Sequence, residues 1–362
     1  MSSDPHLTEL GFYTLAGHTR SPRDVVSEMP AAEALGLGAA FISERYNFKE
    51  AGAIAGAMGA VSETLGLATA ATNHNTRHPL LTASLATTLH TMTGGRFALG
   101  LGRGVDLRFQ AIGLNKVTSA QIEDFAGLMR RLWKGEAIFG HEGPAGSYPY
   151  LHQESYFDFD IPILLVAIGP KTLELAGRVA DGVVLHTYFS DRALETALAA
   201  IARGAESVGR DPATIRVWSV LATIGDHIPA EVRLKKSVGR LATYLQGYGD
   251  ALVTINDWDP AVLARFSADE MVQSFLGAID DRATTEQLEH LATLLPDEWL
   301  AAAATGTPDQ CAAEVARQFS LGVSGVVLHG ATPTELAPVV KAYRAVRPAS
   351  LPTYPANPGR VA

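Results

Sequence analysis

The stretch ILLVAIGPKTLELAGRVADGVVL, residues 163–185, contains one complete strand–helix–strand unit. Short apolar runs at residues 163–167 and 182–185 predict buried strands, and the amphipathic pattern between them predicts a helix over 171–179. A helix that joins two short strands is the usual connection between parallel neighbours in a sheet. The stretch therefore predicts an α/β protein with a parallel sheet covered by helices.

The same order of apolar run, small-residue turn and helix recurs along the chain. Further strands are predicted at residues 10–14, 39–42, 65–71, 97–101, 216–224 and 325–329. Helix starts with capping residues follow several of them, such as Thr118 with Gln121 and Thr332 with Glu335. Eight strands, each followed by a helix, favour a (β/α)8 TIM barrel over an open doubly wound sheet.

Two segments interrupt this rhythm. Residues of about 139–160 are rich in glycine and proline and predict a loop or hairpin, and residues of about 228–305 have a largely helical pattern. We expect residues 1–362 to form a single barrel domain, with both insertions at the C-terminal face of the barrel, where they would wall the functional site.

Composition excludes several classes of function. The 29 basic and 38 acidic residues leave a net charge of −9 without a basic run, which argues against nucleic acid or an anionic membrane surface as a partner. The single cysteine, Cys311, excludes a disulfide framework and a thiolate metal centre. No apolar stretch has the length of a membrane helix. Residues 1–6 show no signal-peptide pattern, so we expect a cytoplasmic protein.

The residues that follow the predicted strands are rich in hydrogen-bond donors and poor in carboxylates. This pattern suits an anionic cofactor better than a divalent metal ion, so we expect no metal site. His74 and His78 have the spacing of helical metal ligands, but Pro79 disfavours a helix through His78 and no third ligand follows.

One turn predicts a phosphate site, and a second leaves room for a ligand. Residues 169–172, Gly-Pro-Lys-Thr, lie where a strand ends and a helix begins, and backbone N–H groups at a helix start bind anions. Arg103 lies between two glycines after another strand. An ordinary turn and a surface arginine are the alternatives. Glu44 beside Arg45 is in the same way either a catalytic pair or a solvated ion pair.

Residues 67–79, 94–104 and 169–182 together resemble the bacterial luciferase-like oxidoreductase superfamily, in its coenzyme F420-dependent (deazaflavin) branch. The resemblance extends over about residues 8–347 and keeps the order and spacing of these motifs. It implies a cis peptide bond at Ala70–Ala71 that supports the flavin-like ring, and a phosphate site at Arg103 and residues 169–172. Glu44 and Arg45 match an acidic–histidine pair that contacts the ring edge and the substrate in relatives.

The resemblance identifies a set of candidate cofactor-binding residues. They are Ala70, Ala71, Thr72, Asn73, Arg103, Gly104, Gly169, Pro170, Lys171 and Thr172. The candidate catalytic residues are His74, Glu44 and Arg45.

Two departures from the family pattern affect the chemistry. Arg45 occupies the place of a histidine, and a guanidinium does not titrate near pH 7. Val105 stands where sugar-phosphate dehydrogenases of the family carry a glutamate, so their substrate is not transferred. His74 is our first choice of acid or base because it follows the predicted bulge, with His186 and His329 as further candidates.

The function expected from the resemblance is hydride transfer between F420 and an unidentified small organic substrate, in either direction, by a homodimer. An FMN-dependent luciferase-like monooxygenase is the first alternative. A non-catalytic flavin-binding protein is the second, and a barrel lyase or isomerase is the third. The third would need a Schiff-base lysine or a metal-binding carboxylate set at the strand ends, and neither is found.

Overall fold

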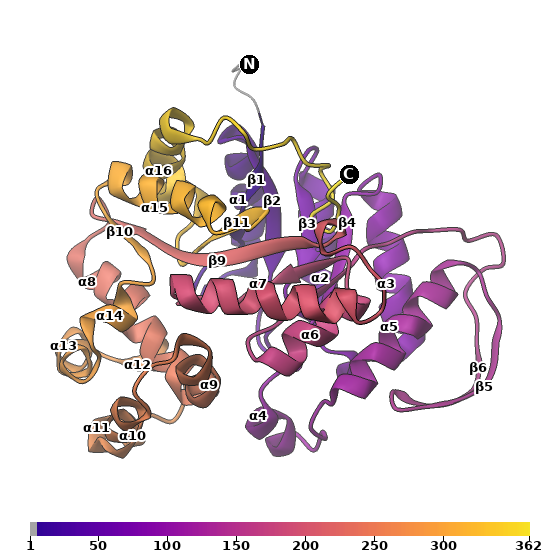
Figure 1. The fold of residues 1–362 in the computed structure, drawn as a ribbon, viewed down its shortest axis with the longest axis horizontal. Helices are drawn as coiled ribbons and strands as arrows, with labels where there is room; N and C mark the ends of the chain where they lie inside the picture. Colours follow the sequence, from indigo (N-terminus) through magenta and orange to yellow (C-terminus); the bar gives the residue numbers. More distant parts are fainter. Residues whose placement is uncertain (1–5) are drawn as a thin grey trace.

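A closed barrel of eight parallel strands forms the centre of the molecule, as predicted (Figure 1). The computed structural model describes residues 6–362, so residues 1–5 of the segment inspected for a signal peptide lie outside it. The order around the barrel is β9-β11-β1-β2-β3-β4-β7-β8, and pairing of β8 with β9 closes it. The strands are β1 (Leu7–Tyr13), β2 (Leu37–Ile42), β3 (Gly66–Thr69), β4 (Phe97–Leu101), β7 (Ile163–Val166), β8 (Gly182–Val184), β9 (Arg216–Gly225) and β11 (Gly325–His329).

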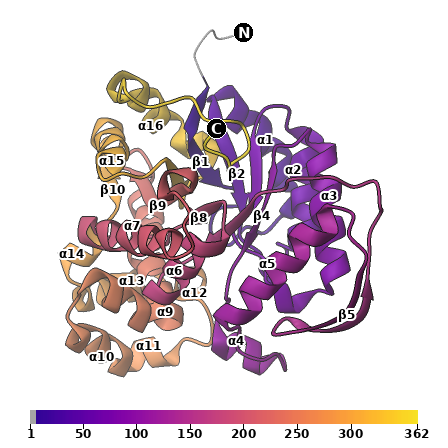
Figure 2. The ribbon, with the colours of Figure 1, turned by 45° about the vertical axis from the view of Figure 1, so that its right-hand side comes forward.

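Helices cover the outside of the barrel (Figures 1 and 2). They are α1 (Val25–Ala34), α2 (Ala51–Val61), α3 (Pro79–Met92), α5 (Ser119–Trp133), α6 (Pro170–Val179), α7 (Asp191–Glu206), α15 (Pro308–Ser320) and α16 (Pro333–Val346). Short pieces in the connections are η1 (Pro22–Asp24), η2 (His74–Thr76), α4 (Asp106–Ala111) and η3 (Pro212–Thr214). Among the described residues, no helix has the length and apolar character needed to cross a membrane.

Alternation along the strands separates two apolar cores. Ala39 and Phe41 of β2 point into the barrel, whereas Ala40 and Ile42 belong to the larger core between the strands and the helices. The rings of Phe41 and Trp218 meet edge to face inside the barrel, 5.1 Å apart. The barrel is therefore a packed core and not a pore.

The C-terminal tail closes the N-terminal end of the barrel. The indole N–H of Trp218 donates to the carbonyl oxygen of Pro358 at 2.8 Å, and the Asn357 amide donates to that of Phe97 at 2.9 Å. The start of β1 and the C-terminus both lie at this end of the molecule (Figure 1). The opposite end, where the strands finish, is therefore the end available for a functional site.

The second insertion is helical, as predicted, and lies beside that C-terminal end (Figure 1). Its elements are α8 (Ala230–Leu234), the π-helix η4 (Lys235–Gly239), α9 (Arg240–Asn256), α10 (Pro260–Ala268), α11 (Glu270–Ser274), α12 (Ile279–Arg282), α13 (Thr285–Leu294), α14 (Asp297–Leu300) and the short strand β10 (Ala304–Gly306). Strand β10 extends the sheet by pairing in parallel with the end of β9.

The first insertion is the hairpin of β5 (Ile138–Gly143) and β6 (Gly146–Leu151). It lies along the outer side of α5, where His141 Nε2 is 3.0 Å from a carboxylate oxygen of Asp124 (Figure 2). Tyr148 meets His78, at the start of α3, with ring centroids 5.4 Å apart. Both contacts are with the first halves of helices that follow β3 and β4, so the hairpin extends along the outside of the helical layer towards the C-terminal end of the barrel. That the hairpin walls the functional site stays a prediction.

Candidate functional site

A cis peptide bond joins Ala70 and Ala71, as expected, directly after β3. The backbone around it is held by neighbouring strands. The amide of Ala70 donates to the carbonyl oxygen of Ile42 at 2.7 Å, and the hydroxyl of Tyr13 donates to the carbonyl oxygen of Ala70 at 3.1 Å. The amide of Glu44 donates to the carbonyl oxygen of Ala71 at 3.2 Å. The backbone at Ala70–Ala71 is thus held in place by hydrogen bonds with the protein's own neighbouring segments.

Glu44 is engaged in a nearly buried ion pair with Arg77. Both carboxylate oxygens accept from the Arg77 guanidinium, and one also accepts from the Thr72 hydroxyl at 2.6 Å. The Glu44 side chain is only 4% exposed. The hydrogen bonds that Arg77 donates to Glu44 raise the pKa of Arg77 above its usual value. In this geometry the carboxylate orients the loop after the bulge, and it would have to give up these contacts to act as a base.

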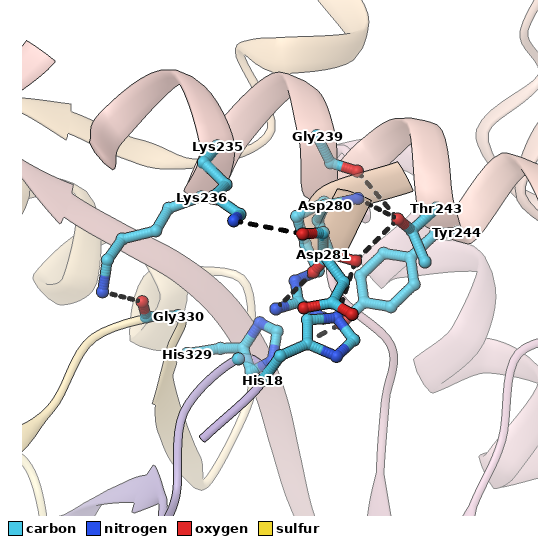
Figure 3. A network of polar contacts seen from close by, with 12 residues as sticks. His18, Lys235, Lys236, Gly239, Thr243, Tyr244, Asp280, Asp281, His329 and Gly330 are labelled. Atoms are coloured by element: carbon cyan, nitrogen blue, oxygen red, sulfur yellow. Dashed lines mark hydrogen bonds and ion pairs between the residues drawn. The ribbon is translucent and has the colours of Figure 1, made fainter. Parts of the chain in front are cut away.

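Arg45 lies at the barrel mouth beside a histidine that we did not predict. Its Nη1 is 3.4 Å from Nδ1 of His18, and Nε2 of His18 is 2.8 Å from a carboxylate oxygen of Asp280 (Figure 3). Asp280 also pairs with Arg240 at 2.7 Å. Burial, followed by the charge of Arg240, lowers the pKa of Arg45.

His74 contacts the outer layer of the barrel. Its ring packs against Phe125 of α5 with centroids 5.5 Å apart, and Nδ1 has no hydrogen-bond partner within residues 6–362. Burial lowers the pKa of His74. The neighbouring Asn73 donates to the carbonyl oxygen of Gly102 at 2.8 Å. The role of His74 as acid or base therefore stays a prediction, and these contacts do not support it.

The predicted phosphate residues come together at the start of α6. Nη1 of Arg103 is 3.4 Å from the hydroxyl oxygen of Thr172, and its Nε and Nη2 donate to the carbonyl oxygen of Val117. Gly169 is the N-cap of α6, and a side chain added there would meet nothing within 4 Å. Pro170 and Lys171 are exposed, and Gly104 has a φ of +68°, which favours glycine.

Histidines and tyrosines that sequence reasoning did not combine line the centre of the mouth. His329 Nδ1 lies 3.3 Å from the Thr187 hydroxyl, and its Nε2 lies 3.4 Å from the Tyr244 hydroxyl (Figure 3). The His186 ring meets those of Tyr244 and Tyr248 at 4.6 and 5.3 Å.

Burial controls the protonation of these histidines. It lowers the pKa of His186 to about 4 and that of His329 well below its usual value. Both are therefore neutral near pH 7, and each has one ring nitrogen that can accept a hydrogen bond.

One signal in the sequence could have found part of this cluster. Arg240, Tyr244 and Tyr248 are spaced four residues apart, so a helix places them on one face. The spacing of His18 and Asp280 carries no such signal, because 262 positions separate them.

The sequence profile of the luciferase-like monooxygenase family matches residues 7–325. The chain belongs to this family. Members of the family use F420 or FMN. The family shares the barrel fold found here, so the end of the barrel described above is the place to look for a cofactor.

Relatives and solved structures agree with the family. The chain is 28% identical over 305 residues to a 5,10-methylenetetrahydromethanopterin reductase of Methanolobus tindarius, covering 82% of this chain and 86% of that protein. It is 26% identical over 337 residues to an F420-dependent glucose-6-phosphate dehydrogenase of Beutenbergia cavernae, covering 88% and 90%. The structure of the coenzyme F420-dependent tetrahydromethanopterin reductase from Methanopyrus kandleri matches with a TM-score of 0.75 at 20% identity, covering 94% of this chain and 99% of that one.

The residues present at this end fit a phosphorylated flavin-type cofactor. The small side chains of Ala70 and Ala71 leave their backbone accessible to a flat ring. Arg103, Thr172 and the start of α6 offer a guanidinium, a hydroxyl and backbone N–H groups to a phosphate. No group of three or more His, Cys, Asp or Glu residues within residues 6–362 is arranged to hold a metal ion.

Proposed function

We propose that this protein is an oxidoreductase that transfers a hydride between coenzyme F420 and a small organic substrate. The observation that carries the proposal is the convergence of Arg103 with Thr172 at the start of α6. The two full-length relatives described above, both at about 27% identity, support F420 over other cofactors.

The protein's own residues would have three tasks in this reaction. Arg103, Lys171 and Thr172 would bind the cofactor phosphate by charge-assisted hydrogen bonds. The backbone of Ala70–Ala71 would support the ring from behind. When bound, F420 supplies the carbon that accepts or donates the hydride.

The mouth of the barrel offers a pair of hydrogen-bonding groups that could orient a substrate during this transfer. His329 Nε2 and the Tyr244 hydroxyl are 3.4 Å apart, and burial keeps His329 neutral. Arg45 stays charged near pH 7 and would also orient a substrate. The cytoplasmic location and the homodimeric state remain predictions.

Cofactor titration tests the proposal. The apo-protein is titrated separately with F420 and with FMN, and binding is followed by fluorescence. We expect tighter binding of F420, because Arg103 and Lys171 near the strand ends suit its long anionic tail. Binding of FMN without measurable affinity for F420 would overturn the proposal in favour of the second candidate, an FMN-dependent monooxygenase. That candidate is favoured by the match to a monooxygenase family.

A non-catalytic flavin-binding protein is separated from both enzymes by redox turnover. The F420-loaded protein is mixed with a panel of alcohols, aldehydes and organic acids, and F420 absorbance is followed over time. A change in absorbance that needs both protein and substrate supports the oxidoreductase.

A further inference from the structure

Three cationic side chains gather at one side of the barrel mouth, apart from the residues assigned to the cofactor phosphate. We call Arg45, Lys49 and Arg240 the cation cluster. Arg45 and Lys49 come from the connection between β2 and α2, and Arg240 is the first residue of α9 in the helical insertion. The cluster therefore joins the barrel to the helical insertion.

The cation cluster has one close carboxylate for three positive charges. Asp280 pairs with Arg240 at 2.7 Å and accepts from His18 as well. Within residues 6–362, neither Arg45 nor Lys49 has a carboxylate within 4.0 Å. Lys49 Nζ instead donates to the backbone carbonyl oxygens of Leu15 and Gly17. The cluster therefore carries an excess of positive charge.

Burial makes this excess of positive charge energetically unfavourable. Lys49 is 5% exposed, and burial followed by the charges of Arg45 and Arg240 lowers its pKa to about 7. Glu28, the other acidic group that acts on Lys49, accepts hydrogen bonds from the Thr14 hydroxyl and the Leu15 amide. Buried charges are ordinarily paired, so an arrangement of this kind is typical of a site that receives an anion.

A buried donor in the cluster also lacks a partner. The Arg240 side chain is 5% exposed, and its Nε has no hydrogen-bond partner in the described part of the chain. The Arg240 guanidinium carbon lies 5.8 Å from the centre of the Tyr244 ring, and Tyr244 contacts His329 (Figure 3). The cluster therefore adjoins the histidines and tyrosines at the centre of the mouth.

We propose that the cation cluster is an anion subsite that binds a carboxylate or phosphate group of the substrate. The substrate would then be a small organic acid or phosphate ester whose anionic group is held beside His329 and Tyr244. This inference rests on the proposed function, since it assigns a substrate class to the same mouth. It uses residues distinct from Arg103 and Thr172, which are assigned to the cofactor.

The test measures anion binding by the F420-loaded protein. Succinate and inorganic phosphate are titrated by calorimetry at constant ionic strength, with succinamide as the neutral comparison. We expect saturable binding of at least one anion and none of the amide. Arg45→Met should weaken anion binding at least tenfold and change F420 affinity less than twofold. Lys49→Met should do the same and provides a second variant if Arg45→Met does not fold.

A matched control removes a positive charge elsewhere. Arg192 is 72% exposed and pairs with Asp257 on the surface. Arg192→Met should therefore change neither the affinity for the anion nor the affinity for F420. Equal anion binding by wild type and both cluster variants would overturn the inference. Displacement of F420 by the anions would also overturn it, because the cluster would then hold the anionic tail of the cofactor. Anion binding that depends on Arg45 in a protein that fails to bind F420 would contradict the proposed function alone.

Discussion

The guanidinium of Arg103 lies 3.4 Å from the hydroxyl of Thr172, although 69 positions separate them in the chain. Arg103 follows β4, and Thr172 lies in the first turn of α6, after β7. Because β4 and β7 are paired neighbours, their ends bring these two side chains together. The contact thus joins two separate sequence motifs into one anion-binding surface.

We expect Arg103→Ala to weaken F420 binding by roughly 10- to 100-fold, which corresponds to about 1.4–2.8 kcal/mol. The protein should stay folded, because this half-buried side chain contributes little to the apolar core. Fluorescence titration measures the affinity, and calorimetry measures the melting temperature. An unchanged dissociation constant would show that Arg103 is a surface arginine without a role in cofactor binding.

Glu44 and Glu50 both pair with Arg77 but differ in exposure, at 4% and 53% of the side chain. We expect Glu44→Gln to lower the free energy of unfolding by about 2–4 kcal/mol, because it leaves Arg77 without its buried partner. Glu50→Gln should cost less than about 1 kcal/mol. Urea denaturation compares the two variants. Equal losses would contradict the assignment of Glu44 as the structural partner.

The lowered pKa of Lys49 predicts a dependence of stability on pH. Burial, Arg45 and Arg240 lower it to about 7, against the opposing effects of Glu28 and Asp280. The unfolded chain regains a pKa of about 10.4, so between about pH 7 and pH 10 it binds more protons than the folded state. Stability from this group therefore rises with pH across that window.

Lys49→Met isolates this effect from other titrating groups. The free energy of unfolding of the wild type should rise relative to the variant by on the order of 1 kcal/mol per pH unit between about pH 7 and pH 10. Urea denaturation at several pH values provides the measurement. If the free energy of unfolding depends on pH in the same way in the two proteins, Lys49 has an ordinary pKa.

Arg216 lies at the N-terminal end of the barrel, opposite the candidate functional site. Its guanidinium donates to backbone carbonyl oxygens of Thr8 and Asn357, and it lies between the rings of Trp218 and Tyr354 at 4.4 and 4.5 Å. We expect Arg216→Lys to lower stability by about 2–4 kcal/mol, since an ammonium cannot stack and bond in this way. F420 affinity of the folded protein should not change. Loss of F420 binding without loss of stability would contradict the placement of the site.

Local sequence signals were sufficient for most of the framework. The predicted strands at residues 97–101 and 325–329 match β4 and β11, because short apolar runs between turns have few other stable arrangements. The capping boxes at Thr118 and Thr332 form as predicted, since each needs only residues three positions apart. The cis peptide bond at Ala70–Ala71 was expected only from the family resemblance.

The contacts of the site depended on the tertiary structure. Glu44 neighbours Arg45 in the sequence, but its carboxylate turns to Arg77, and Arg45 turns to His18. Adjacent side chains on an extended segment point in opposite directions, so neighbours in sequence need not form a pair.

The sequence by itself therefore determined the barrel, its helical layer and the residues that end each strand, because these follow from periodicity, turns and caps within a few positions. Only the tertiary structure decided that Asp280 pairs with Arg240 and His18, and that Lys49 is buried beside them. Closure of the barrel and docking of the helical insertion create these contacts. The protonation of each group then depends on burial and on charges that are distant in the chain.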